Sequence, residues 1–104
     1  MSIIKDLLQT AVTENASDLH LKSGREPYMR VNGALVPTRF DILAPDDLRQ
    51  IADDIMPPHL RKSFEASHEA DFSHHEPDVG RFRINIFHAQ RVPAIAIRHA
   101  LGRQ

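Results

Sequence analysis

The run from Gly80 to Phe87 is the stretch of this chain whose residue types most plainly suggest chemistry. It alternates apolar and polar residues, so a strand would place Arg81, Arg83 and Asn85 together on one face. A second alternating run ends at Arg98, and one antiparallel register would put it opposite Arg83. Because like charges side by side on a sheet cost energy, this register predicts an anion between them, and a phosphate fits.

The apolar residues support that register. A turn over the four residues Ala89 to Val92 pairs Ile86 with Ile95 and Ile84 with Ile97. Solvated arginines are common on exposed sheet faces, and on pattern alone this is the more frequent explanation. The functional alternative is a phosphate clamp, to which the planar donor fork of arginine is well suited.

The histidines and one serine suggest two further sites, and both patterns are weak. His74 and His75, followed by Glu76 and Asp78, are predicted to lie in a loop, where neighbouring side chains point apart; we therefore predict no metal site. Ser17, Asp18 and His20 contain the residue types of a catalytic triad. Alternation along an extended segment places Ser17 and Asp18 on opposite faces, which argues against one.

The composition indicates one small globular domain. The chain has 104 residues, 13 Lys and Arg, 14 Asp and Glu, a formal charge of −1 and no cysteine. This near-neutral charge does not indicate a surface that binds nucleic acid. The absence of cysteine suits a reducing cytosol. No apolar run reaches the ~20 residues of a membrane span, so no membrane insertion is expected. The sequence also lacks a Gly-x-x-x-x-Gly-Lys-Ser/Thr loop, so this chain alone is not expected to hydrolyse a nucleotide.

Periodicity predicts the order helix, three strands, two helices, three strands. The first helix is expected to end near Asn15, and Asn32-Gly33 predicts a hairpin between strands 28–31 and 34–38. Pro45 and Pro58 suit the first positions of the next two helices. The last three strands are predicted from Ala70 to Ser73 and in the arginine hairpin. The expected fold is α+β, with a mostly antiparallel sheet and helices packed on one face.

The ordered motifs resemble those of PilT-type ATPases, the type IV pilus retraction motors of the secretion ATPase superfamily. The matching segments, in chain order, are Ala16-Ser17-Asp18-Leu19-His20-Leu21, Pro27-x-Met29-Arg30-Val31-Asn32-Gly33, Asp53-x-Ile55-Met56, Glu69-x-Asp71-Phe72-Ser73, Gly80-Arg81-Phe82-Arg83-x-Asn85, Gln90-Arg91 and Arg98. Each motif is weak, but the ordered set is specific, and it extends to about His99.

The resemblance implies that residues 1–104 form a PAS-like amino-terminal domain, with the RecA-like motor domain absent from this chain. Such ATPases are homo-hexamers that bind ATP and Mg²⁺ in the cleft between the two domains. Carried over by motif, Arg83 and Arg98 are expected to act as phosphate-sensing arginine fingers. Arg81 and Arg91 are further possible nucleotide contacts, and no metal ligand is expected here.

The same resemblance implies where the protein works and with what. The expected partners are RecA-like domains of its own and neighbouring subunits and, indirectly, the platform protein of the pilus in the inner membrane. The expected location is cytoplasmic, peripheral to that membrane at the pilus base. A stand-alone PAS-like sensor of small ligands and a protein-interaction module remain alternatives.

Two features depart from the family pattern. Val92-Pro93 follows the Gln-Arg turn where a small residue is usual, and Pro93 lacks the amide hydrogen that a strand would use. The last residues, from His99 to Gln104, also lack the Ile-Pro expected of an interdomain linker.

Overall fold

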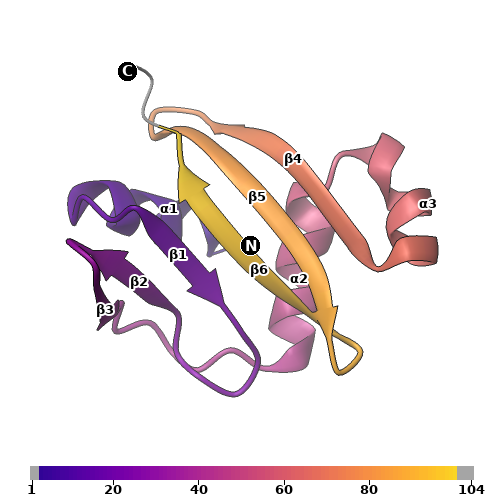
Figure 1. The fold of residues 1–104 in the computed structure, drawn as a ribbon, viewed down its shortest axis with the longest axis horizontal. Coiled ribbons are helices and arrows are strands. Elements are labelled where there is room, and N and C mark those ends of the chain that lie inside the picture. The colour runs from indigo at the N-terminus through magenta and orange to yellow at the C-terminus, as the bar shows by residue number, and fades with distance from the viewer. Residues whose placement is uncertain (1–2, 101–104) are drawn as a thin grey trace.

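The computed structural model describes residues 3–100 and shows the predicted order of elements (Figure 1). The elements are α1 (Ile4–Thr13), β1 (Asp18–Leu21), β2 (Tyr28–Val31), β3 (Ala34–Pro37), α2 (Pro45–Ile55), α3 (Pro58–Ser67), β4 (Glu69–Glu76), β5 (Gly80–Ala89) and β6 (Val92–His99). Pro45 and Pro58 begin their helices as expected, because a first-turn proline has no hydrogen-bond partner to lose. No helix within the described residues is long and apolar enough to cross a bilayer.

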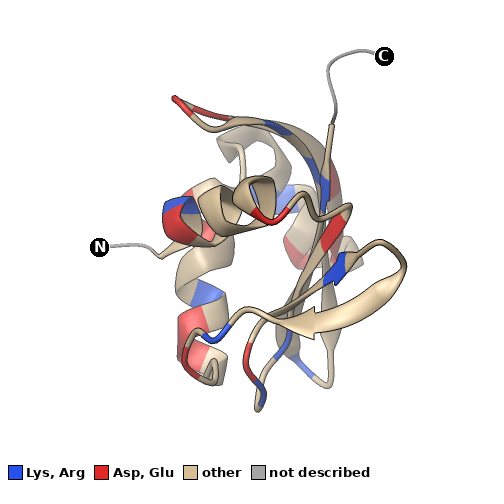
Figure 2. Ribbon diagram, turned by 90° about the vertical axis from the view of Figure 1, so that its left-hand side faces the viewer, with Lys and Arg blue, Asp and Glu red and all other residues tan. Residues whose placement is uncertain are grey.

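The strands form one antiparallel sheet with the helices on a single face. The strand order is β3-β2-β1-β6-β5-β4, so that the first and last strands of the chain, β1 and β6, pair at the centre of the sheet. Seen from the side, all three helices lie on one side of the sheet (Figure 2). The predicted α+β class, with helices on one face, is therefore confirmed.

The register of the last hairpin is the one that the apolar pairs predicted. Ile84 pairs with Ile97, Ile86 with Ile95, and Arg83 with Arg98. The two residues between β5 and β6, Gln90 and Arg91, both have positive φ, at 56° and 69°. This backbone conformation follows the twist of a two-residue hairpin, and it costs energy for residues other than glycine.

The prediction of a loop at His74 and His75 was wrong, because β4 continues to Glu76. Glu76 pairs with Gly80, so the turn between β4 and β5 is short and includes Asp78 at φ 65°. A continuous partner strand supplies backbone hydrogen bonds as far as Glu76, and these outweigh the weak strand preference of the local residues. The His74 ring nitrogen Nε2 lies 2.9 Å from Glu76 Oε1 on the same side of the strand.

The core lies between the sheet and the helices. The apolar stripes of α1 and α2 supply Leu7, Leu8 and Leu48, all fully buried. The sheet supplies the inward residues of its central strands: Leu19, Leu21, Phe82, Ile84, Ile86, Ile95 and Ile97. Helix α3 has no fully buried residue and packs through Leu60 and Phe64 at the edge of this core.

Pro93 lies where it disturbs the sheet least. It pairs with His88 in the β5–β6 ladder, whereas β1 pairs with β6 only over Ile95 to Arg98. At Pro93, β6 therefore has a neighbouring strand on one side only, as is usual for proline in a sheet. Residues 101–104, in which the linker pattern was also unusual, lie outside the described residues.

Candidate functional site

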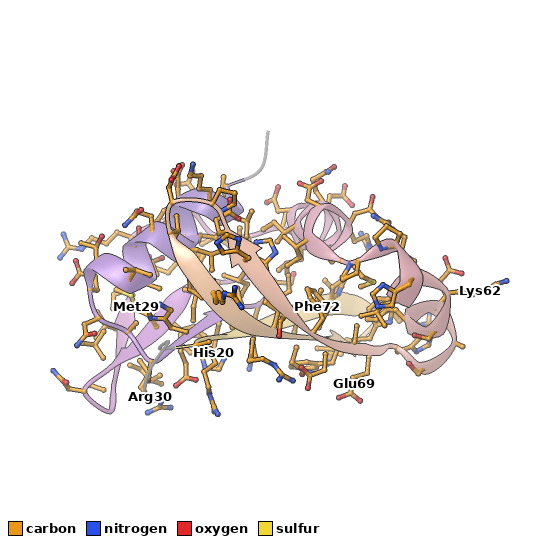
Figure 3. The ribbon with its side chains drawn as sticks, turned by 90° about the horizontal axis from the view of Figure 1, so that it is seen from above. His20, Met29, Arg30, Lys62, Glu69 and Phe72 are labelled. Atoms are coloured by element: carbon orange, nitrogen blue, oxygen red, sulfur yellow. The ribbon has the colours of Figure 1, made fainter. Side chains whose placement is uncertain are left out.

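The face of the sheet away from the helices carries the residues of interest. Figure 3 shows His20, Arg30 and Glu69 on this side, while Met29 and Phe72 lie toward the helices. Because side chains alternate between the two faces along each strand, the faces of the remaining side chains follow from these labelled residues. Arg83 and Asn85 of β5 share this open face with Arg98, because cross-strand partners project to the same side.

Arg83 and Arg98 are direct cross-strand neighbours, and each is paired with a carboxylate on its outer side. Arg83 Nη2 donates to Asp71 Oδ1 at 3.0 Å, from β4. Arg98 Nε donates to Asp18 Oδ1 at 3.4 Å, from β1. The arginine side chains remain 59% and 76% exposed. The expected charge pair is therefore present, and the two flanking carboxylates reduce its repulsion.

A shallow depression of about 410 Å³ lies over this part of the sheet. Its polar lining consists of Asp18, His20, Asp71, Arg83, Asn85 and Arg98. The volume falls in the range of small-ligand sites, but most such sites have mainly apolar walls. A lining with two guanidinium groups suits an anionic ligand better than an apolar one.

His20 is held in this depression by an aromatic stack that the sequence patterns did not predict. Its ring stacks on that of Tyr28, with centroids 5.0 Å apart and planes at 19°, and Arg25 lies 4.1 Å over the Tyr28 ring. Burial lowers the pKa of His20, against the opposing effect of Asp18. The pairing of His20 with Tyr28 across β1 and β2 is the signal that could have indicated the stack.

The two further arginines lie in different places. Arg81 is exposed and lies two residues before Arg83 in β5, so it shares the open face. Arg91 lies in the turn at the other end of the hairpin. There it borders a groove that also includes Met56, Phe64 and His88, next to α2 and α3. The structure therefore brings Arg81, Arg83 and Arg98 onto one face and separates Arg91 from them.

The serine and histidine patterns form no site in the described residues. Ser17 Oγ donates to Asp18 Oδ2 at 2.9 Å, so the expectation that these side chains point apart was wrong. Ser17 precedes the strand, where alternation does not apply, and its hydroxyl also contacts Arg30 O. Within residues 3–100, no three His, Cys, Asp or Glu side chains are placed to hold a metal ion.

Comparisons with known proteins cover most of the chain. No family model matches the sequence. The chain is 39% identical over 88 residues to the type IV pilus retraction ATPase PilT of Pseudomonas aeruginosa, covering 85% of this chain and 26% of that protein. It is 30% identical over 92 residues to the type IV pilus ATPase PilU of the same organism, covering 88% of this chain and 24% of PilU.

A solved structure shows the same fold. The pilus retraction motor PilT with bound ADP superposes with a TM-score of 0.88 at 31% identity, over 99% of this chain and 30% of that chain. The fold and the ordered motifs thus define the amino-terminal domain of a secretion ATPase. Within that superfamily the chain corresponds to the amino-terminal domain of the PilT-type ATPases. It spans about a quarter of the length of the curated relatives that it matches.

Proposed function

We propose that this domain works in a hexameric type IV pilus retraction ATPase and contacts the phosphates of ATP through Arg83 and Arg98. The observation that carries the proposal is the placement of the two guanidinium groups side by side on the sheet face opposite to α1, α2 and α3 (Figure 2). A RecA-like domain against this face would hold ATP in the cleft between the two domains. Arg81, on the same face, is a further candidate contact, and Arg91 is a more distant one.

The carboxylate partners leave these arginines available. Exposed ion pairs contribute roughly 0–1 kcal/mol, so Arg83 and Arg98 can exchange Asp71 and Asp18 for a phosphate at small cost. A phosphate offers more charge and accepts bidentate hydrogen bonds. Asp71 and Asp18 would also hold the guanidinium groups in place while no nucleotide is bound.

Contacts of this kind would couple ATP hydrolysis to motion. Charge develops on the γ-phosphate oxygens during phosphoryl transfer, and an arginine finger contributes roughly 10³–10⁵ in rate. Closure of the two domains would depend on the γ-phosphate, as in nucleotide switches whose segments are held by this group and freed when it is hydrolysed. Mg²⁺ would accompany ATP, and we assign it no ligand in this domain because residues 3–100 offer no suitable group of side chains.

The proposed assembly places the domain between two motor cores. Its open sheet face would meet the RecA-like domain of its own subunit, and its other side would pack on that of the neighbouring subunit. The names of the relatives, which are pilus retraction and pilus ATPases, support a place at the pilus base. The protein would then act at the cytoplasmic side of the inner membrane, with its force reaching the platform protein of the pilus.

ATP turnover by a protein that carries this domain ahead of a RecA-like core tests the proposal. Arg83→Gln and Arg98→Gln are each expected to lower kcat by at least about 10³, the lower end of an arginine finger's contribution. Lys62→Gln removes one positive charge from exposed α3, away from the open face, and should lower kcat far less than either arginine variant (Figure 3). Wild-type turnover in both arginine variants would contradict the assignment.

A further inference from the structure

A slot for a flat ring lies beside the arginine pair. Ala96 of β6 pairs with His20 on one side and with Asn85 on the other. Since adjacent strands lie about 4.8 Å apart, His20 and Asn85 are separated by about 10 Å, with only a methyl group between them. A planar aromatic group standing over Ala96 would fit between the two longer side chains. All three residues border the depression that contains the arginines.

One wall of this slot is an oriented aromatic surface. Tyr28 stacks on His20 and so fixes the tilt of its ring, while Arg25 packs over Tyr28. The imidazole is mostly neutral near pH 7, because burial lowers its pKa from an ordinary value of 6.5. A neutral, oriented ring at the edge of a cleft is well suited to stacking on a nucleobase.

The opposite wall offers a hydrogen-bond acceptor. Asn85 Nδ2 donates to the carbonyl of Ala70 and to the carboxylate of Glu69, at 3.3 and 3.4 Å. Both contacts use the amide nitrogen, which leaves Asn85 Oδ1 as an acceptor within the described part of the chain.

We propose that the slot over Ala96 binds the base of the nucleotide whose phosphates Arg83 and Arg98 contact, with the base stacked on His20. Arg83 and Arg98 lie two residues along their strands from Asn85 and Ala96, or about 7 Å away. A nucleotide lying across the open face would thus meet an aromatic wall and a cationic pair in succession. This inference rests on the proposed function and adds a base-recognising role for His20.

Titration of the 104-residue chain by NMR tests the slot, with ATP and inorganic tripolyphosphate as the two probes. Near pH 8, where His20 is neutral, ATP should move the His20 ring protons upfield through the ring current of the base, and tripolyphosphate should not. ATP should also bind more tightly, by roughly fivefold or more, as a stacked base contributes. His20→Ala should remove this difference, and His20→Phe should preserve it.

The outcomes separate the slot from the arginine role. If both probes bind equally, shift the Arg83 and Arg98 side-chain signals and leave the His20 ring unaffected, the slot is wrong and the arginine contacts stand. If neither probe shifts any of these signals at millimolar concentration, both the slot and the phosphate contacts in this chain are contradicted. An upfield His20 shift that persists in Arg83→Gln/Arg98→Gln would support base stacking independently of the arginines.

Discussion

Arg83 and Arg98 face each other across β5 and β6, and each donates to a carboxylate on the side away from the other. The contacts are 3.0 Å to Asp71 and 3.4 Å to Asp18. The sequence predicted that two facing arginines would need an anion between them. In the structure, the flanking carboxylates stabilise the pair and leave the space between and above the arginines open.

Removing one of these carboxylates should strengthen phosphate binding. Asp71→Asn keeps the shape of the side chain but leaves Arg83 without its ionic partner. We expect the affinity of the chain for tripolyphosphate to rise by up to about fivefold, because an exposed ion pair is worth no more than about 1 kcal/mol. The measurement is isothermal titration at low salt, where exposed charges are least screened.

Asp46→Asn is the matched control for that experiment. Asp46 forms an exposed ion pair with Arg49 at 2.9 Å on α2, away from the open face. Its replacement should leave tripolyphosphate affinity at the wild-type value. An equal gain in both variants would mean that net charge, rather than release of Arg83, governs binding.

Neighbouring residues of β5 should differ sharply in their effect on stability. Ile84 is fully buried, so Ile84→Ala should lower the free energy of unfolding by about 2–5 kcal/mol. Arg83→Ala, one residue earlier on the exposed face, should change it by less than about 1 kcal/mol. Urea unfolding followed by circular dichroism distinguishes the two, and similar losses would contradict the assignment of the faces.

Stability should change in opposite directions when residues at positive φ are replaced in the β2–β3 turn and in the β5–β6 turn. Arg91 has φ 69°, so Arg91→Gly should stabilise the chain by about 1 kcal/mol through relief of backbone strain. Gly33 has φ +84°, and a Cβ added there would meet no other atom, so Gly33→Ala should destabilise by a similar amount through strain alone. Thermal midpoints of the two variants test this, and a loss in Arg91→Gly would indicate that the arginine side chain stabilises the fold.

Stability should fall below about pH 6.5 because of two histidines. Burial lowers the pKa of His20, and burial followed by the neighbouring His68 lowers that of His88. The unfolded chain then binds more protons than the folded chain as the pH falls through the ordinary value of 6.5, so acid favours unfolding and the full stability is present above it.

His88→Gln isolates one part of that effect. The His88 ring lies 4.7 Å from that of His68 and meets the edge of Phe64, with Arg49 as the nearby charge. The urea midpoint of the variant should change less than that of the wild type between about pH 7.5 and 5.5, a range that spans histidine titration. If the urea midpoint of the variant changed between these two pH values as much as that of the wild type, His88 would be excluded as a contributor.

The sequence predicted the fold well where apolar period and turn chemistry agreed. Ile84, Ile86, Ile95 and Ile97 define one register, and it is the observed one. Asn32-Gly33 similarly defines the first hairpin, in which Met29 pairs with Val36. Local patterns suffice in these places because a shift of one residue would turn every apolar side chain toward solvent.

The sequence was less informative where a distant partner decides the structure. His74 and Glu76 have weak strand preference, and only the pairing of Glu76 with Gly80 shows that β4 continues to that point. The stack of His20 on Tyr28 likewise depends on a cross-strand neighbour from another segment. The pairing of each arginine with its own carboxylate required the strand order, which places β4 and β1 on either side of the β5–β6 hairpin.

The most direct test of the central claim is the turnover of the Arg83→Gln/Arg98→Gln double variant in a protein that joins this domain to the RecA-like core of a PilT-type ATPase. If both arginines contact the same phosphates, kcat should fall by about 10³ or more, and the double variant should lose less than the product of the two single losses. The variant domain should fold with nearly the wild-type free energy of unfolding, because both side chains are exposed. Wild-type kcat in the folded double variant would contradict the claim.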